Sequence, residues 1–559
     1  MSLTVIVALC ASCVLIFALA RYKASSRNIP FPPGPRSRFL FGNIFDLPFE
    51  QPWRGFTEWR TIYGSDLVHF ELFGKHTIIL NRKELADVTS GEACQHLLRS
   101  TIHHDGGPYR MGRARFCHEW RAHRRLLQKG FRHDVSQRYQ PIQRNKVQEF
   151  LSNLLHHPEG FMSHTRTLAA AVIIAVVYGH DVTPTNDPFV EVAEKAMATL
   201  VEMISPAGNA LNFFPSLRFL PGWLPGCGFQ QRLAACRTLT EEMVNVPADS
   251  VLSDMTSGTA KPCLLVELLE ANRANGGSAL QAEYIKRVAA SSYAAGAETT
   301  ASFLETFFLA MTLHPQVQAK AQQEIESVIG QGRLPTFEDR VNLPYVGAVY
   351  RETHRWSPVL PMGLPHCTTA DDVVNGYFIP KGTTVLGNIW AITRDPVNYP
   401  DPESFIPERF IRENGSLNDD DVSSSNVSAK PTRDDVDCES PLSYNGTQTT
   451  LTTPRILNSI TTFFISTNQH SILSCIHLNH DTDRTDVLRD VGRASRPGGT
   501  DAYEEFRRKG KKVGVLERSR DTQKKRKIVE LNDAGEGTGG FESERKNIKK
   551  KGNKGNKGS

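Results

Sequence analysis

The sequence lacks the marks of small metal-binding, disulfide-rich and nucleic-acid-binding proteins. Its 10 cysteines are scattered and show no zinc-ligand spacing, and the one C-x-x-C pair, Cys10 and Cys13, lies in an apolar run. This usage favours a reduced cytosolic environment over a disulfide scaffold. The net charge is only +5 over 559 residues, which gives no reason to expect a nucleic-acid partner. The sequence contains no internal repeat, and its length could hold one large domain or several smaller ones.

One long uncharged apolar run is present, at Leu3–Ala20. At about 1.5 Å per helical residue, it is just long enough to cross a hydrocarbon core of about 30 Å. Its Ala-Leu-Ala end also resembles a signal-peptide cleavage site, which leaves a cleaved leader as the alternative. Basic residues follow the run (Arg21, Lys23, Arg27) and none precedes it. The positive-inside rule therefore favours residues 1–20 as an anchor with the rest of the chain in the cytoplasm.

The segment that follows, Pro30–Pro35, contains four closely spaced prolines. Because proline fixes φ and removes a backbone donor, this composition predicts a stiff extended spacer. Behind a membrane anchor, such a spacer sets how a catalytic domain lies on the bilayer, whereas an ordinary Pro-rich linker would have no such role. We interpret residues 21–35 as a hinge and residues 36–421 as the catalytic domain.

The pattern of apolar residues predicts a mainly α fold with a small β part. A helix is expected at Trp53–Tyr63, followed by a hairpin around Gly74. Helical periodicity then dominates to about residue 330, with breaks at proline and glycine clusters. After Pro358 the pattern changes to short strands and turns, including Gly376–Gly382.

The character of the chain changes again at Asp419–Ser425, where a polar stretch begins. Residues 422–559 are rich in polar and charged residues. The clusters Lys524–Lys527 and Lys549–Lys551 resemble nuclear-localisation or RNA-binding patches. Low apolar content and the absence of periodicity favour a disordered tail instead.

Three patterns carry candidate chemistry. Ala295–Thr300 (A-G-A-E-T-T) lies in a helical segment expected from about Ala282 to Leu313. Gly296 lowers local helix propensity, and a threonine hydroxyl can bond back to an earlier carbonyl, so the two can open the helix where a ligand must approach. An acid beside a hydroxyl in such a notch is suited to relaying protons, although most Glu-Thr pairs on helices are surface or cap residues.

The second pattern joins Glu352 and Arg355 to Arg409, which lies in the aromatic-flanked segment Phe405–Phe410. At i and i+3 on a helix, the first two side chains share one face and can pair. Most such pairs are exposed and contribute little.

The third pattern contains groups suited to an anion. On a helix, Trp120 and Arg124 lie one turn apart, so that an indole N–H and a guanidinium can reach the same acidic group. The alternative is a basic amphipathic helix with a core tryptophan. His366 follows the apolar run Val359–Met362.

In this order, the patterns resemble a cytochrome P-450, and the anchor with its Pro-rich hinge resembles the microsomal fungal type. Trp120–Gln140 and Phe405–Asp421 are most similar to basidiomycete enzymes often named O-methylsterigmatocystin oxidoreductase-like. The resemblance covers roughly residues 1–421. It implies the cytochrome P-450 fold, a haem b cofactor, and a monooxygenase that inserts one oxygen atom into an apolar small molecule in secondary or xenobiotic metabolism.

The resemblance also implies residue roles and partners. Glu298 and Thr299 would be catalytic and deliver protons to the bound dioxygen, and Val359–Met362 and Val201–Pro225 would line the substrate pocket. Electrons would come from an NADPH-cytochrome reductase at the cytosolic face of the endoplasmic reticulum membrane. The haem propionates would be bound by Trp120, Arg124 and His366, and a buried ion network would join Glu352, Arg355 and Arg409.

The family's iron ligand is the feature that this sequence does not contain. The resemblance places a cysteine in a loop F-x-x-G-x-R-x-C-x-G a few dozen residues after Arg409, and no segment matches. Cys438 is near the expected distance, but its acidic neighbours would raise its pKa and disfavour the thiolate. Cys475 fits no better. We therefore predict no metal ligand among the residues of this chain.

Two explanations of the missing loop remain open. Val422 and Ser423 can be encoded by GTGAGT, a common start of an intron, so the tail can be translated intron sequence. The chain can equally be a non-catalytic remnant. A membrane-tethered binding protein with a basic tail is a third hypothesis, for which residues 1–421 give no reason. Cys94–Cys117 is also shorter and more polar than the family's loop at that place.

Overall fold

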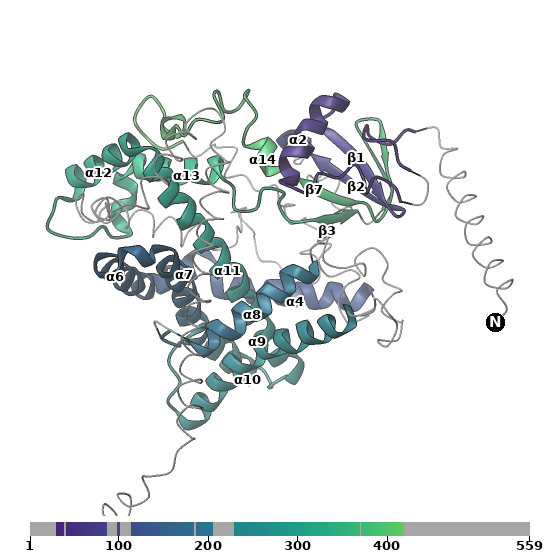
Figure 1. Ribbon diagram of the computed structural model, residues 1–559. Coiled ribbons are helices and arrows are strands. Elements are labelled where there is room, and N and C mark those ends of the chain that lie inside the picture. The colour runs from purple at the N-terminus through teal and green to yellow at the C-terminus, as the bar shows by residue number, and fades with distance from the viewer. Residues whose placement is uncertain are drawn as a thin grey trace, which may run out of the picture. The chain divides into compact units, whose positions relative to one another are not determined.

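The computed structural model describes residues 29–38, 41–85, 98–100, 113–183, 186–204, 229–368 and 370–418, all within one compact unit, Met1–Arg484 (Figure 1). Several segments discussed above lie outside these residues. They are the expected anchor Leu3–Ala20, the tail from Asp421 with both of its cysteines, and most of Cys94–Cys117 and Val201–Pro225.

The described part is mainly helical, which confirms the predicted fold class. Its α-helices are α2 (Pro52–Tyr63), α4 (Arg113–Phe131), α5 (His133–Ser136), α6 (Gln140–His156), α7 (Phe161–Tyr178), α8 (Pro188–Ile204), α9 (Phe229–Ser257), α10 (Leu264–Ala274), α11 (Ala279–Leu313), α12 (Pro315–Ile329), α13 (Pro344–Trp356) and α14 (Ile389–Ile392). Short 3-10 turns accompany them: η3 (Gln137–Tyr139), η4 (Pro158–Gly160), η7 (Glu338–Asn342) and η8 (Pro407–Phe410).

The helix ends follow local sequence signals. Proline occupies the first turn of α2, α12 and α13, where its missing N–H costs nothing. The long helix α11 starts at Ser278, whose hydroxyl accepts a hydrogen bond from the backbone N–H of Gln281. Gly179 ends α7 with a φ of 67°, a left-handed conformation that favours glycine. One proline does not break its helix, because α9 continues through the buried Pro247.

The β part is a five-stranded sheet in the order β1-β2-β7-β4-β3 and a separate two-stranded sheet. The predicted hairpin is confirmed, and β2 pairs in parallel with β7, with Ile78 opposite Val385. The sequence did not predict this pairing, since the two strands lie about 300 positions apart. The strands are β1 (Leu67–Leu72), β2 (Lys75–Leu80), β3 (Leu98–Ser100), β4 (His366–Thr368), β5 (Asp372–Val374), β6 (Tyr377–Ile379) and β7 (Thr384–Gly387).

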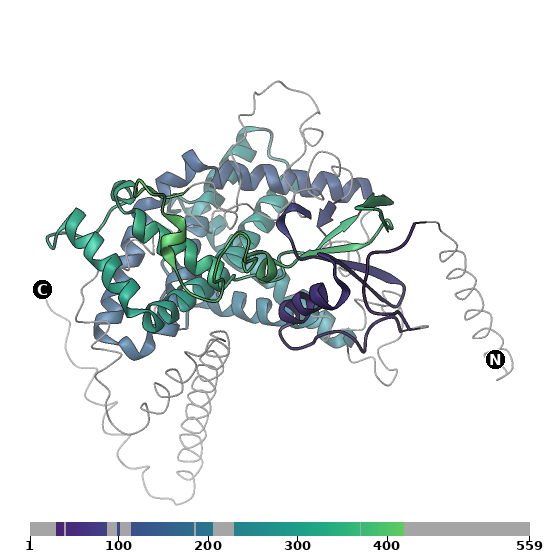
Figure 2. The same ribbon diagram turned by 90° about the horizontal axis from the view of Figure 1, so that it is seen from above.

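A buried asparagine fixes the early elements to the late ones. Asn388 donates its side-chain N–H groups to the Trp53 carbonyl at 2.9 Å and to Asn81 Oδ1 at 2.8 Å, and its backbone N–H to the Leu80 carbonyl at 2.8 Å. Both views therefore show α2 and β1–β2 beside strands of the late chain, at one side of the helical core (Figures 1 and 2).

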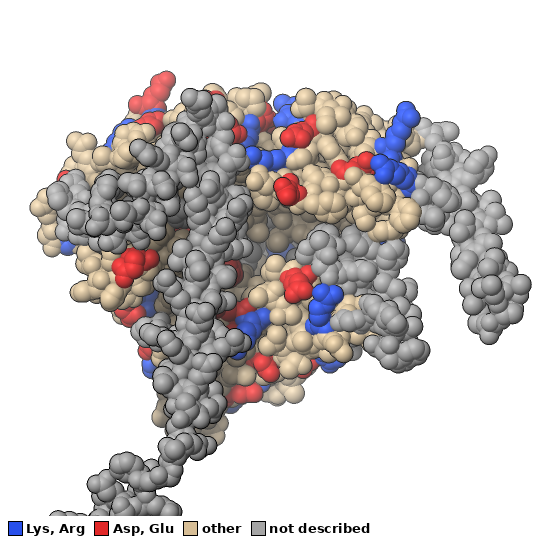
Figure 3. Space-filling view, viewed as in Figure 1, with Lys and Arg blue, Asp and Glu red and all other residues tan. Residues whose placement is uncertain are grey.

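The helical core is centred on α7. By length and composition, Pro158–Tyr178 is capable of crossing a membrane. Its residues Leu168–Tyr178 are buried, however, and α7 packs against α6 and α11. This burial fits a core helix of a globular domain. The surface in Figure 3 mixes acidic and basic side chains, with no broad area of one sign among the described residues of that face.

The Pro-rich segment lies along the sheet. The Phe31 ring stacks on His69 and His76, with ring centroids 5.1 and 5.0 Å apart. The backbone N–H of His69 donates to the Pro33 carbonyl at 2.9 Å. A Cβ at Gly34 would lie 1.8 Å from the His69 carbonyl oxygen, so only glycine fits there. Pro30–Pro35 is thus docked on the domain.

Candidate active site

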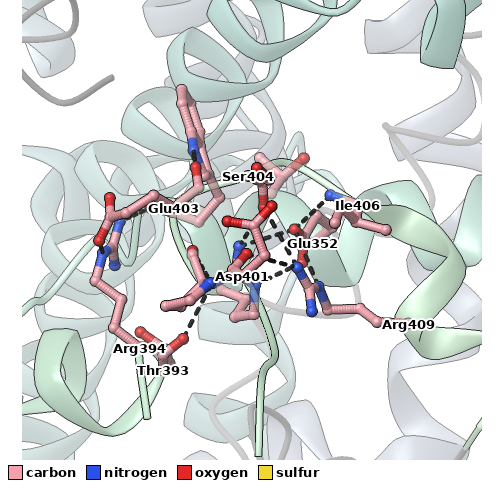
Figure 4. Close-up of polar contacts among 12 residues, drawn as sticks. Glu352, Thr393, Arg394, Asp401, Glu403, Ser404, Ile406 and Arg409 are labelled. Atoms are coloured by element: carbon pink, nitrogen blue, oxygen red, sulfur yellow. Dashed lines mark hydrogen bonds and ion pairs between the residues drawn. The ribbon is translucent and has the colours of Figure 1, made fainter. Parts of the chain in front are cut away.

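Helix α13 carries a completely buried ion pair (Figure 4). The Arg355 guanidinium donates to both carboxylate oxygens of Glu352, at 2.6 Å from Nε and 2.8 Å from Nη2. The i, i+3 spacing that the sequence shows therefore becomes a bidentate pair without solvent contact, and not the usual exposed pair.

Backbone groups of the late chain use the remaining donors and acceptors of this pair. Arg355 donates further to the carbonyls of Thr393, Pro402 and Ser404, at 3.0, 2.8 and 3.1 Å. Glu352 Oε1 accepts the backbone N–H of Ile406 at 2.7 Å. The pair thus fixes the course of the loop that precedes η8, since this loop has no regular secondary structure of its own.

Arg409 joins the pair from η8. Its Nε lies 3.4 Å from Glu352 Oε1, and its Nη1 and Nη2 donate to the carbonyls of Pro400 and Asp401 at 2.8 and 3.1 Å. The structure thus brings together the three side chains that the sequence singled out as an ion network, Glu352, Arg355 and Arg409. We refer to them below as the ion network.

The sequence patterns did not point to a second buried arginine, Arg394. Arg394 lies over the Trp390 ring, donates from Nη2 to the Trp356 carbonyl at 2.6 Å, and pairs with Glu403 at 3.1 Å. Burial lowers the pKa of Arg394 to about 9. The aromatic residues near Arg394 in sequence gave a weak signal, but the contact with Trp356 depends on how the loop folds back onto α13.

The acid and hydroxyl of α11 lie next to each other on an unbroken helix. Thr299 donates from Oγ1 to the Ala295 carbonyl at 2.6 Å, which is the predicted bond to an earlier carbonyl, and Glu298 is exposed. The role of Gly296 differs from the expected one. A Cβ there would meet the Ile173 side chain at 3.2 Å, so this glycine lets α7 approach α11 closely.

The candidate propionate ligands lie on two elements. Arg124 is half-buried on α4, and the side chain of Trp120, on the same helix, lies outside the described part. His366 is half-buried on β4, and burial lowers its pKa, so the imidazole is neutral near pH 7. A neutral imidazole can still donate one hydrogen bond to a carboxylate. Among the described contacts, no hydrogen bond or ion pair joins Arg124 to His366.

The apolar run before His366 is partly exposed. Leu360 is 47% exposed, whereas Met362 packs against the cluster of α2, β1 and β2. The Pro361 carbonyl accepts the backbone N–H of Trp390 at 3.0 Å, which ties the run to α14. Leu360 therefore remains available for contact with an apolar molecule.

Arg124 and His366 are side-chain types that can donate hydrogen bonds to a carboxylate, whereas none of the described cysteines is suited to the iron of a haem. The described free cysteines are Cys236, Cys263 and Cys367, all buried, and none of them follows Arg409 in the described part of the chain. Burial raises the pKa of the Cys236 and Cys263 thiols, which disfavours the thiolate. In the part of the chain that the structure describes, no group of three or more His, Cys, Asp or Glu side chains is arranged for a metal.

Comparisons with known proteins agree with this fold. A family model for cytochrome P450 matches residues 32–427. Cytochrome P450 monooxygenase COX1 of Coprinopsis cinerea is 35% identical over 72% of this chain and 79% of the relative. Cytochrome P450 monooxygenase 208 of Postia placenta is 37% identical over 73% and 80%. Cytochrome P450 monooxygenase ple1 of Rhodocybe pseudopiperita is 36% identical over 69% and 75%. These matches show that the chain belongs to the fungal cytochrome P450 monooxygenase family.

Proposed function

We propose that residues 36–418 are the scaffold of a haem-dependent monooxygenase that inserts one oxygen atom from O2 into an apolar small molecule of fungal secondary or xenobiotic metabolism. The observation that carries the proposal is the ion network, because Glu352 and Arg355 are fully buried there and the Arg409 side chain is only 11% exposed. Burying such charges is costly unless a specific architecture supplies their partners. A haem, when bound by this family, supplies the oxygen chemistry. An NADPH-cytochrome reductase would supply the electrons.

The chain's own residues would position the cofactor and handle protons. Arg124, Trp120 and His366 would bind the propionates, the arginine through a charge-assisted contact. Glu298 is exposed and can exchange protons with solvent, and the neighbouring Thr299 hydroxyl can hold a proton at Oγ1. The exposed Leu360 and the region Val201–Pro225 would contact the substrate.

We further propose that this polypeptide does not complete the iron site by itself. The sequence contains no cysteine in the family's motif, and the described thiols are buried elsewhere. A graft tests both halves of the proposal: residues 1–418 are joined to the segment of the Coprinopsis relative that follows its equivalent of Asn418. The junction is anchored, since Leu417 packs against the cluster of Ala348, Tyr399 and Phe410.

The graft is expected to bind haem with the spectrum of a thiolate ligand and to give a spectral shift with apolar compounds, and the original chain is not. A graft that folds but binds no haem would contradict the assignment. Reverse-transcribed message that continues unspliced past Asp421 in every clone would rule out intron read-through and favour the non-catalytic remnant.

Membrane association is the remaining part of the proposal. It is supported by the apolar run Leu3–Ala20 and by exposed aromatic side chains just after the Pro-rich segment. Phe41, Phe45 and Phe49 are 49, 66 and 67% exposed, and Arg38 lies over the Phe45 ring. Aromatic and basic side chains together are typical of a bilayer interface. We expect the whole chain to stay with membranes through alkaline carbonate extraction and a variant lacking residues 1–20 to be released.

A further inference from the structure

Helix α4 is joined to α11 by an ion pair that no sequence pattern indicated. Glu119 Oε1 accepts a hydrogen bond from Arg287 Nη1 at 2.9 Å, and the carboxylate side chain is only 11% exposed. Arg287 is held from its other side, because its Nε donates to Glu283 one turn earlier on α11, also at 2.9 Å. Glu283 on the same helix therefore helps to fix the orientation in which the guanidinium contacts α4.

Apolar contacts surround this pair. Ala122 and Leu126 of α4 belong to the same buried cluster as Tyr284 and Val288 of α11. The His123 ring meets the Tyr284 ring edge to face, with centroids 5.1 Å apart. Apolar contacts of this kind permit small rotations of a helix, whereas a charge-assisted hydrogen bond between partly buried groups has a narrow geometry.

The periodicity of a helix relates this contact to the candidate site. At about 100° per residue, Glu119 and His123 share the face of α4 that lies on α11, and Arg124 follows on the adjacent face. On α11, Arg287 precedes Glu298 by about three turns, or roughly 16 Å, on one side of the helix. The ion pair thus lies on the side of α11 that also carries Glu298, where α4 packs against α11.

We propose that Glu119 and Arg287 are positioning residues, whose ion pair sets the rotation of α4 against α11 and so aims Arg124 at the carboxylates of the porphyrin. This inference rests on the proposed haem function. It adds that the ion pair between α4 and α11 does not touch the porphyrin itself and affects its binding only by orienting Arg124.

The test measures the binding of two porphyrins to full-length variants in which the carboxylate of Glu119 or of Asp249 is changed. Glu119→Gln keeps a hydrogen-bond acceptor and removes the charge, and Glu119→Ala removes both. The matched control is Asp249→Asn, because Asp249 pairs at 2.7 Å with Lys286, the neighbour of Arg287, and belongs to α9. Each protein is titrated with iron-free protoporphyrin IX and with its dimethyl ester, which has the same ring without free carboxylates. Iron-free porphyrin needs no axial ligand.

The expected result is selective. Glu119→Gln should weaken protoporphyrin IX binding about three- to tenfold, Glu119→Ala should weaken it more, and neither should change binding of the ester. Hydrogen exchange should become faster in α4 in both variants and stay unchanged there in Asp249→Asn. The inference would be overturned if the Glu119 variants bound protoporphyrin IX and its ester with equally weakened affinity, or if hydrogen exchange in α4 stayed unchanged in them.

The same titration separates this inference from the proposed function. If the unsubstituted chain binds neither porphyrin, the propionate site fails and the aiming of Arg124 fails with it, while hydrogen exchange still shows whether Glu119 docks α4. If the unsubstituted chain binds protoporphyrin IX more tightly than its ester and Glu119→Ala keeps the same affinities, the propionate site stands and the positioning role is contradicted.

Discussion

The sequence singles out polar side chains in two regions of the molecule. The first is the ion network of α13 and η8, and the second is the Glu298–Thr299 turn of α11. The two regions differ in their exposure to solvent. Glu352 and Arg355 have no solvent exposure, and seven hydrogen bonds or ion pairs with each other, Arg409 and the backbone surround them. Glu298 is exposed, and the Thr299 hydroxyl donates to a carbonyl of its own helix.

This difference separates a stabilising role from the chemical role that we propose for Glu298 and Thr299. A buried charge that loses its partner remains uncompensated in a medium of low polarity, so loss of one member of the ion network should strongly destabilise the domain. An exposed carboxylate beside a half-buried hydroxyl loses little when it is changed, and it can exchange protons with water. Substitutions should therefore separate the two regions by their effects on stability.

The largest effect is expected at Glu352. Glu352→Ala leaves Arg355 buried without a counter-charge, and we expect the free energy of unfolding to fall by about 3–5 kcal/mol. Chemical denaturation of the full-length chain measures it. The control is Glu241→Ala, which breaks an exposed i, i+4 pair with Arg237 and should cost about 0.5 kcal/mol or less. Similar losses for the two variants would contradict a special role of the ion network.

The second effect is a pH dependence at His354, which lies between the two regions. Its ring contacts Phe303 of α11, with centroids 4.3 Å apart, and its buried Nε2 has no hydrogen-bond partner among the described residues. Burial lowers the pKa of His354 from 6.5 to about 4. Between these values the unfolded chain binds the proton more readily, so the free energy of unfolding should fall as the pH drops from about 6.5 to about 4.

One pKa unit corresponds to about 1.4 kcal/mol, so His354 contributes up to about 3 kcal/mol to this pH dependence. His354→Leu removes the contribution and should leave stability near pH 7 almost unchanged, because no hydrogen bond of Nε2 is lost. Stability curves of both proteins from pH 4 to pH 8 test this. Curves of equal slope below pH 6.5 would refute it.

A smaller effect is expected at Thr299. Thr299→Val keeps the branched shape and removes the hydrogen bond to the Ala295 carbonyl, which costs about 1 kcal/mol or less because that carbonyl remains in the helix ladder. Thr306→Val is the matched control, since Thr306 makes the same bond to Ser302 in the buried second half of α11. Thermal unfolding should give similar losses for both. A loss above 2 kcal/mol for Thr299→Val alone would give Thr299 a structural role instead.

The smallest effect on stability is expected at Glu298. Glu298→Gln should change the free energy of unfolding by less than about 0.5 kcal/mol, since the side chain is exposed. In the graft with the Coprinopsis segment, it should lower product formation about 100-fold if Glu298 relays protons. Product formed per NADPH consumed measures this. Unchanged product formation would remove Glu298 from the proton path.

Local patterns predicted the elements and not their long-range contacts. The helix α11, the β1–β2 hairpin and the Glu352–Arg355 pair follow from spacing within a few residues. The parallel pairing of β2 with β7 and the Glu119–Arg287 ion pair join positions far apart in the sequence, and no local signal indicates them.

Gly296 shows the limit of a local argument at the candidate site. Its low helix propensity suggested an opened helix, whereas α11 is continuous and the glycine makes room for Ile173 of α7. The identity of a neighbouring helix cannot be read from the helix itself. By contrast, the hydrogen bond of Thr299 is local to one turn, and the sequence predicted it.

The most direct test of the account is the carbon-monoxide difference spectrum of the reduced full-length chain, expressed with membranes. Residues 36–418 have the family's fold, and the sequence contains no cysteine suited to the iron. We therefore predict no Soret band of the thiolate type from this polypeptide, and such a band from the graft. A thiolate-type band from the original chain would contradict the account, and its loss in Cys438→Ala would identify the ligand.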